Sequence, residues 1–209
     1  VYEGTREGNP YTVERKVTMD TSTFPISTYA HEIKENGIFS EKEYYQNSAD
    51  QVLLWGAGIK DEGSLYDLRF SNGLPVIRFP VVVSDHQYST TTGEFTQFPG
   101  YTFNVSMDVL VMAQETVDLG FVTFEAYKVR YEMRVWGQGL DYTDIFYWWV
   151  VPYIGAIKDE DADSSVKLTS FAIGEGTITH QSDADRDGLR DYQEIFKGQT
   201  DWLDGDTDD

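Results

Sequence analysis

Two stretches of alternating apolar and polar residues constrain the fold of this chain more than any other feature. From Phe103 to Val111 every second residue is apolar and the residues between are mostly polar, and Val129 to Val135 repeats the pattern with charged residues between. A period of two places one set of side chains in a core and the other in water, as in an antiparallel sheet. We therefore expect two strands here, each with one buried face.

The rest of the first 173 residues also favours strands. Further β-prone segments are residues 11–19, 29–33, 39–45, 51–55, 65–70, 75–83, 145–151 and 166–173. Residues 158–165 are acidic and are expected to form a hairpin loop, and no segment before residue 180 has a convincing helical period. This pattern predicts an all-β domain over residues 1–173, either an antiparallel β-sandwich or a strongly curved open sheet. Residues 174–182 are the expected linker to a segment at 183–209.

Composition excludes several classes of partner and chemistry. The chain carries a formal net charge of −20, so nucleic acids and anionic lipids are not expected partners. It contains no cysteine, which excludes disulfides and thiolate metal sites. The longest apolar run, Ile145 to Ile154, is too short to cross a bilayer, so no membrane span is expected.

A twelve-residue acidic loop near the end of the chain matches the calcium-loop template. Aspartates occupy positions 1, 3, 5 and 9, Gly188 takes the sharp turn at position 6, and a glutamate closes the loop at position 12. Calcium requires six to eight oxygen ligands, which this spacing supplies from alternate residues and one peptide carbonyl. The predicted calcium ligands are Asp183, Asp185, Asp187, Leu189 through its carbonyl, Asp191 and Glu194.

The flanks of this loop refine the prediction. Residues 174–182 lack helical periodicity, whereas Asp191 to Lys197 can form one short exiting helix that ends at Gly198. The loop is therefore EF-hand-like rather than a complete EF-hand. Calcium loops with weak affinity, with a Kd of about 10⁻⁴–10⁻³ M, are typical of extracellular modules, where calcium is abundant.

The chain from Asp183 onward resembles the bacterial thrombospondin type 3 repeat. The first unit is complete, Thr200-Asp201 matches the connecting motif although Trp202 replaces the usual proline, and Asp206-Thr207-Asp208 resembles the opening of a second, truncated unit. The resemblance implies Ca2+ held between short loops, with Asp206 and Asp208 as secondary ligands. It also implies an exported bacterial protein, secreted, periplasmic or on the cell surface, whose chain continues past Asp209.

A looser resemblance covers residues 100–175. The order of strands, with the aromatic stretch Tyr147 to Lys158 near its end, is similar to β-domains of bacterial exported lipoproteins. Some proteins of that shape hold lipid or lipoprotein on a concave apolar face. The resemblance therefore implies a carrier of lipid or another hydrophobic molecule.

Aromatic residues of the 145–154 run are the predicted ligand-binding residues of the β-domain. Trp148, Trp149 and Tyr153 can stack on a carbohydrate or line a groove, although large aromatic residues of a β-domain more often fill its core. The three histidines, His31, His86 and His180, have no spacing that predicts a zinc site. No catalytic motif is present, and the plentiful acids leave a carboxylate pair open but unidentified.

These observations predict a non-enzymatic, calcium-binding, exported or cell-surface bacterial protein. Calcium would stiffen the acidic segment, and the β-domain would serve interaction or assembly with copies of itself or with surface proteins. Two alternatives remain: a lipid- or hydrophobe-binding carrier, and a carbohydrate-binding β-sandwich. A cavity lined by the 145–154 strand favours the carrier, and two exposed coplanar aromatic rings favour carbohydrate binding.

Overall fold

The fold is described here from a computed structural model of the chain. The structure describes residues 1–20, 22–24, 26–61, 64–152, 154–173 and 176–178. Over these residues it contains fourteen β-strands and no helix, and hence no helix long and apolar enough to cross a membrane. The strands are β1 (Tyr2–Arg6), β2 (Asn9–Asp20), β3 (Thr28–Glu35), β4 (Ile38–Asn47), β5 (Gln51–Asp61), β6 (Ser64–Arg78), β7 (His86–Phe95), β8 (Thr102–Asp118), β9 (Thr123–Gly137), β10 (Leu140–Val151), β11 (Gly155–Glu160), β12 (Ser164–Leu168), β13 (Phe171–Ile173) and β14 (Gly176–Ile178).

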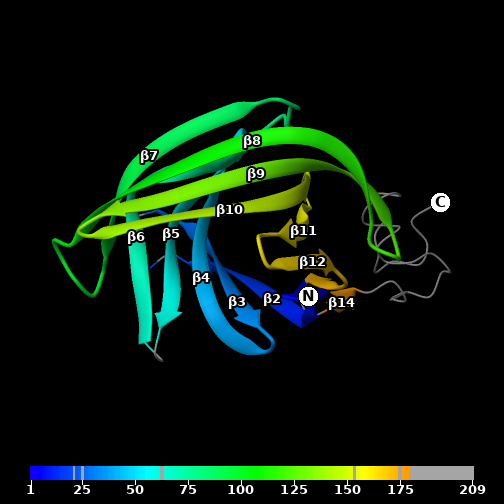
Figure 1. Cartoon of the computed structure of the whole chain (residues 1–209), viewed down its shortest axis with the longest axis horizontal. Helices are drawn as coiled ribbons and strands as arrows, with labels where there is room; N and C mark the ends of the chain where they lie inside the picture. The colour runs from blue at the N-terminus through cyan, green and yellow to red at the C-terminus, as the bar shows by residue number, and fades with distance from the viewer. Residues whose placement is uncertain (21, 25, 62–63, 153, 174–175, 179–209) are drawn as a thin grey trace.

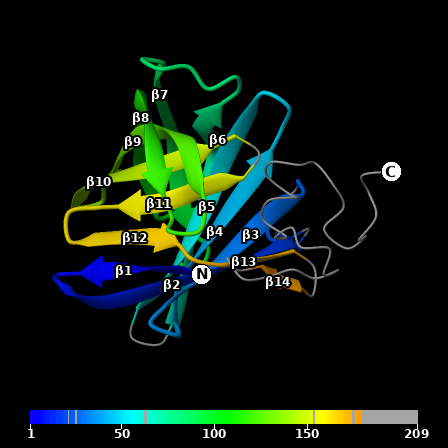
Figure 2. The same ribbon diagram turned by 90° about the vertical axis from the view of Figure 1, so that its right-hand side faces the viewer.

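The first twelve strands form one closed antiparallel barrel. Each strand pairs with the next along the chain, and β1 pairs with β12 to complete the ring. Figure 1 shows β7 to β10 as long curved strands that cross above β4 to β6. Figure 2 shows the closing side, where β10, β11, β12, β1 and β2 lie side by side in this order. Strands β13 and β14 form a separate two-stranded sheet.

The predicted sandwich or open curved sheet is wrong, although the all-β antiparallel class is right. A barrel differs from a curved open sheet by one strand pair, here Tyr2 to Arg6 against Ser164 to Leu168, and from a sandwich because all twelve strands form one continuous ring. Alternation along a strand reports which face is buried but not whether the sheet closes. The closing strand β1 has little apolar alternation of its own, so the local pattern gives no sign of it.

The predicted hairpin loop at 158–165 is also wrong in extent. Its first residues belong to β11 and its last to β12, so only residues 161–163 form the turn. Asp161 Oδ1 organises this turn by accepting hydrogen bonds from the backbone N–H groups of Asp163 (2.9 Å) and Ser164 (2.7 Å). An aspartate that accepts from the backbone two residues on is a standard turn-former.

The two alternating stretches form the centre of β8 and β9, as predicted. Val105, Met107, Val109 and Tyr131 are at most 2% exposed and belong to the main core cluster inside the barrel. Each fully buried side chain of this size stabilises the fold by about 1.5–3 kcal/mol through removal of apolar surface from water. The strands therefore turn apolar residues inward and charged residues outward.

Unequal strand lengths leave the first half of β10 paired on one side only. Strand β11 pairs with β10 only from Tyr147 to Val151, so among the described strands Leu140 to Phe146 has a neighbour on the β9 side alone. The adjoining hairpin β11–β12 turns back at residues 161–163. Over the first half of β10 the barrel wall therefore lacks the hydrogen-bonded neighbour on the β11 side that the second half has.

Candidate functional site

The main candidate site is a cavity of about 200 Å³ inside the barrel. Strands β2, β4 to β6 and β8 to β11 contribute to it. The residues that line it are Arg15, Glu41, Glu43, Tyr45, Leu54, Ala57, Val76, Met107, Tyr131, Met133, Asp144, Phe146, Trp148, Asp159 and Asp161. Among these, five are carboxylic acids and one is a base, so the cavity is acidic as well as apolar.

Three aromatic rings form one wall of the cavity. Tyr131 stacks on Phe146 with ring centroids 5.0 Å apart and nearly parallel planes, and Trp148 lies 4.9 Å from Tyr131. Phe146 and Trp148 are two residues apart on β10, so both side chains point inward. The contacts fix the three rings relative to one another, with the Trp148 plane tilted by 57° from that of Tyr131 and by 51° from that of Phe146.

Arg15 is the basic group of the cavity and is held by two carboxylates. Its guanidinium lies 2.9 Å from Asp159 Oδ2 and 3.7 Å from Glu43 Oε2, and its Cζ lies 5.4 Å from the Trp148 ring centroid. The side chains of Arg15, Glu43 and Asp159 are 17%, 18% and 22% exposed, respectively. Burial opposes protonation of Arg15, but the nearby Glu43, Tyr2 and Asp159 keep the pKa of Arg15 above its usual range.

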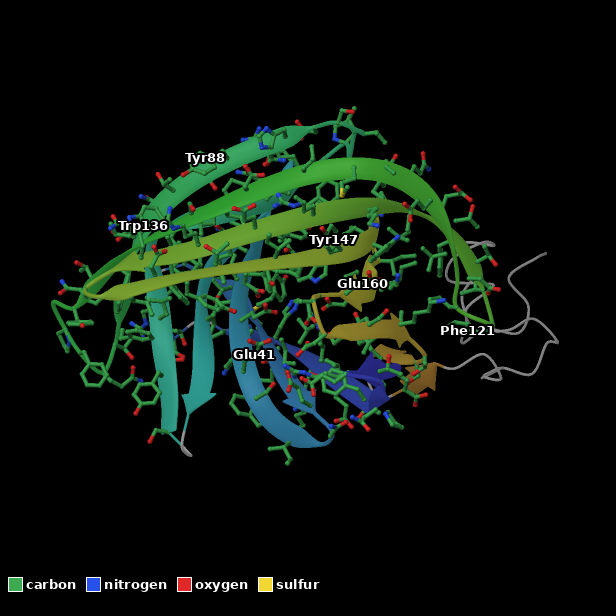
Figure 3. All side chains as sticks on the ribbon, in the orientation of Figure 1. Glu41, Tyr88, Phe121, Trp136, Tyr147 and Glu160 are labelled. Atoms are coloured by element: carbon green, nitrogen blue, oxygen red, sulfur yellow. The ribbon has the colours of Figure 1, made fainter. Side chains whose placement is uncertain are left out.

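Three further acids lie toward the open side, on β4, β10 and the turn after β11. Glu41, Asp144 and Asp161 make no ion pair with any described basic group. Figure 3 shows Glu41 on β4 beneath β10. Tyr142 is 51% exposed. Burial, and then the charges of the nearby Asp144, Asp161 and Glu41, raises the pKa of its hydroxyl. We call Glu41, Asp144 and Asp161 the mouth acids.

Burial, and then the charge of neighbouring acids, raises the pKa of several acids of the cavity. Burial, then the charge of Glu43, raises the pKa of Glu41 to about 7, although Arg15 opposes this. Burial likewise raises the pKa of Glu43 and Asp159 in spite of Arg15, and it raises the pKa of Asp144. In contrast, hydrogen bonds within the turn lower the pKa of Asp161 although burial opposes them. Part of the cluster therefore holds protons near neutral pH.

The raised pKa of Glu41 predicts a stability that falls as pH rises. The folded state binds a proton on Glu41 up to about pH 7, whereas a glutamate in the unfolded chain loses its proton near the ordinary pKa of 4.5. The resulting loss in the free energy of unfolding is absent below about pH 4.5, grows up to about pH 7 and is constant above that. Glu41→Gln is expected to stabilise the protein by on the order of 1–3 kcal/mol at about pH 8 and by little at about pH 4.5.

Urea denaturation across this pH range measures the effect, with the exposed Glu14 changed to Gln as the matched control. The control is expected to follow wild type. A Glu41→Gln variant with the same pH profile as wild type would show that Glu41 ionises normally in the folded protein.

Two buried polar atoms of the cavity have no hydrogen-bond partner among the described residues. They are the hydroxyl of Tyr131, whose side chain is 0% exposed, and Oε2 of Glu43. Buried polar atoms in folded proteins are nearly always paired with protein, water or ligand. Glu43 Oε2 forms the 3.7 Å ion pair with Arg15, so of these two atoms the Tyr131 hydroxyl is the one with neither a hydrogen bond nor a charged partner among the described residues.

His31 lies next to the cavity, with its ring centroid 4.6 Å from that of Tyr45. Burial, followed by the charge of Arg15, lowers the pKa of His31 to about 4. His31 is therefore neutral at physiological pH and adds no positive charge to the acid cluster. Among the described residues, no group of three or more histidine and acidic side chains is arranged to hold a metal ion.

The two predicted tryptophans lie on opposite faces of β10. Trp148 lines the cavity, whereas Trp149 packs in a second cluster with Val117, Ala126, Ile157 and Leu168. The Trp149 indole N–H donates to Glu115 Oε2 at 2.9 Å, and the Lys158 ammonium lies 3.7 Å from its ring centroid. Tyr153 lies outside the described residues. Trp148 is thus the predicted ligand residue that the fold places in the cavity.

The predicted calcium segment also falls outside the described residues. This applies to Asp183, Asp185, Asp187, Leu189, Asp191, Glu194, Asp206 and Asp208. Within the predicted linker 174–182, residues 176–178 form strand β14. The calcium site and the helix after it stay predictions.

The acids and the arginine of the cavity are the functional candidates that sequence reasoning missed. A usable signal was present, since Glu41, Glu43 and Tyr45 alternate, as do Asp144, Phe146 and Trp148. In each set a carboxylate shares the face of a large aromatic residue that is expected to be buried. Charged residues on a buried face are rare and mark sites or ion pairs.

Comparison with known proteins yielded no matching family model, no matching curated protein and no matching solved structure.

Proposed function

We propose that this protein is a non-enzymatic, exported ligand-binding barrel that holds a small molecule in its interior cavity and carries a calcium-binding segment at its C-terminal end. The observation that carries the proposal is the cavity itself, which joins an aromatic wall to acidic side chains and includes Tyr131, whose buried hydroxyl has no hydrogen-bond partner among the described residues. Barrels with cavities of this kind commonly bind one small ligand.

The cavity supports the carrier alternative over the carbohydrate alternative. Asp144, Phe146 and Trp148 of β10 line it, which is the strand predicted to face a bound hydrophobic molecule. Carbohydrate stacking requires exposed rings, and Trp148 and Trp149 are only 9% and 3% exposed. A volume of about 200 Å³ suits a compact ligand and is below the usual range for drug-sized ones, about 300–1,000 Å³.

A thermal-shift screen of small aromatic and aliphatic compounds tests the binding function. Ala57 lines the cavity, so Ala57→Phe is designed to fill it. We expect compounds that raise the Tm of wild type, because a ligand at about 100 times its Kd stabilises by about 2.7 kcal/mol. The same compounds are expected not to shift Ala57→Phe.

The matched control is Ala162→Phe, at an exposed position of the β11–β12 turn. This variant is expected to respond as wild type does. If no compound shifts wild type, or if Ala57→Phe responds equally, the cavity is not the binding site.

Calcium binding is the second part of the proposal. Its support is the complete spacing of ligands from Asp183 to Glu194 and the negative charge of the segment. We expect calorimetry to detect calcium binding with a Kd of about 10⁻³ M or tighter and protection of residues 181–209 from limited proteolysis. Asp187→Ala is expected to lose both effects.

Asp163→Ala, which removes an exposed acid from the barrel, is expected to bind calcium as wild type does. Absence of both heat and protection in the wild-type protein would contradict the calcium assignment. Removal of calcium by a chelator is expected to leave the barrel's strand signal in circular dichroism unchanged.

A further inference from the structure

We infer that the cavity selects a compact organic cation, with its charged nitrogen among the mouth acids and its apolar part against Tyr131, Phe146 and Trp148. This inference rests on the proposed function and names the ligand class of the same site. The chemical class is a protonated amine on a short aromatic or branched aliphatic body.

The first argument is charge. Arg15 is already paired with Glu43 and Asp159, and that group of three has a net negative charge when both acids are ionised. The mouth acids add up to three further negative charges with no described basic partner. All three are partly buried, and Asp161 is satisfied by hydrogen bonds within its turn. Glu41 and Asp144 are therefore the acids whose charge would be balanced either by protons or by a cationic ligand.

The second argument is independent of the acids. The hydroxyl of Tyr131 is fully buried, lines the cavity and has no hydrogen-bond partner among the described residues. Burial raises the pKa of this hydroxyl, so it is neutral at physiological pH and can accept a hydrogen bond from an ammonium group. A buried polar atom without a partner is a group that a donor bound in the cavity would satisfy.

The third argument is shape. Phe146 and Trp148, packed against the fully buried Tyr131, present aromatic surface that attracts both cations and apolar groups. A cavity of about 150 Å³ accommodates benzene, so a volume of about 200 Å³ accommodates a ring with a short arm. A long acyl chain does not fit in this volume.

An anion is the opposite choice, and the arrangement of Arg15 disfavours it. An anion would have to displace Asp159 or Glu43 from the guanidinium and would then lie among unpaired carboxylates. Both steps oppose binding, because like charges in a poorly hydrated site repel strongly.

Three probes of similar size test the inference by calorimetry at about pH 8: phenethylamine (cation), 2-phenylethanol (neutral) and phenylacetate (anion). We expect phenethylamine to bind at least about tenfold more tightly than 2-phenylethanol and phenylacetate not to bind measurably. Asp144→Asn and Glu41→Gln are each expected to weaken phenethylamine about tenfold and to leave 2-phenylethanol unchanged.

A second readout is proton release. Because a cation favours the ionised form of Glu41, phenethylamine binding near pH 7 is expected to release protons. Titrations in two buffers of different ionisation enthalpy measure the number released. The Glu41→Gln variant is expected to release fewer protons than wild type.

Each other outcome overturns the inference and has a distinct meaning for the proposed function. Equal affinities for phenethylamine and 2-phenylethanol, both lost in Ala57→Phe, would show a cavity that binds without charge selection. Preference for phenylacetate would assign recognition to Arg15. If no probe binds but the screen finds a neutral ligand that Ala57→Phe blocks, the ligand class is wrong and the binding function stands. If the screen also finds no ligand that Ala57→Phe blocks, both the ligand class and the binding function are wrong.

Discussion

Arg15→Met is expected to destabilise the protein by about 3–5 kcal/mol at about pH 8, one of the two largest single-residue effects we predict. The change leaves Glu43 and Asp159 inside the barrel without their shared cation, and removal of one partner from a buried ion pair costs about this much. Methionine retains most of the apolar stem, so the loss reports charge rather than packing. Chemical denaturation provides the measurement.

Neutralising the two acids is expected to restore most of the loss. Arg15→Met combined with Glu43→Gln and Asp159→Asn removes the unpaired charges, as does acidification of the single variant. Arg134, which pairs with Asp141 on the exposed surface, is the control, and Arg134→Met is expected to leave the denaturation midpoint almost unchanged. Equal effects at Arg15 and Arg134 would contradict the buried ion-pair network.

Gly4→Ala is expected to destabilise the protein by about 3 kcal/mol or more and to open the barrel between β1 and β12. A Cβ at this position would lie 1.8 Å from the backbone oxygen of Ser165 and 2.8 Å from the Cα of Val166. Both atoms belong to the backbone of β12, so β1 or β12 must move away, which costs more than ordinary overpacking at about 1–3 kcal/mol. Denaturation and amide hydrogen exchange of β1 and β12 measure the effect.

The neighbouring Glu3 is the matched control because it lies on the same strand and is exposed. Glu3→Ala is expected to change stability by less than about 0.5 kcal/mol and to leave amide protection intact. If Gly4→Ala also behaves in this way, β1 and β12 do not pair as described, and the barrel is not closed at this point.

The sequence predicts the strands of this barrel better than it predicts their closure. The alternation from Phe103 to Val111 places the core of β8 correctly, because burial of one face is a local property of a strand. Closure depends on pairing Tyr2 with Leu168, at opposite ends of the barrel sequence, and no local pattern encodes that contact. The short β1 has Gly4 at its centre and no apolar run.

The cavity shows the same limit. The apolar run around Trp148 predicts that this residue is buried. The sequence contains so many acids that it does not show which few of them face the interior. Asp159 and Asp161 are assigned to a loop because their surroundings are acidic, whereas β11 in fact carries Asp159 into the interior. Arg15 has no distinguishing neighbour in the sequence, and only the folded barrel brings it between β4 and β11.

The acids of the cavity lower the folding stability of the protein. Crowded carboxylates destabilise the empty barrel as pH rises, and a bound cation would relieve that repulsion. Ligand binding is therefore expected to stabilise wild type more at about pH 8 than at about pH 5.

A crystal structure of the intact chain with phenethylamine at about pH 8 tests the central claim most directly. We expect the ring against Trp148 and Phe146 and the ammonium nitrogen within about 3 Å of an oxygen of Glu41, Asp144 or Asp161. Density for phenethylamine outside the barrel, with only water among these acids, would contradict the account.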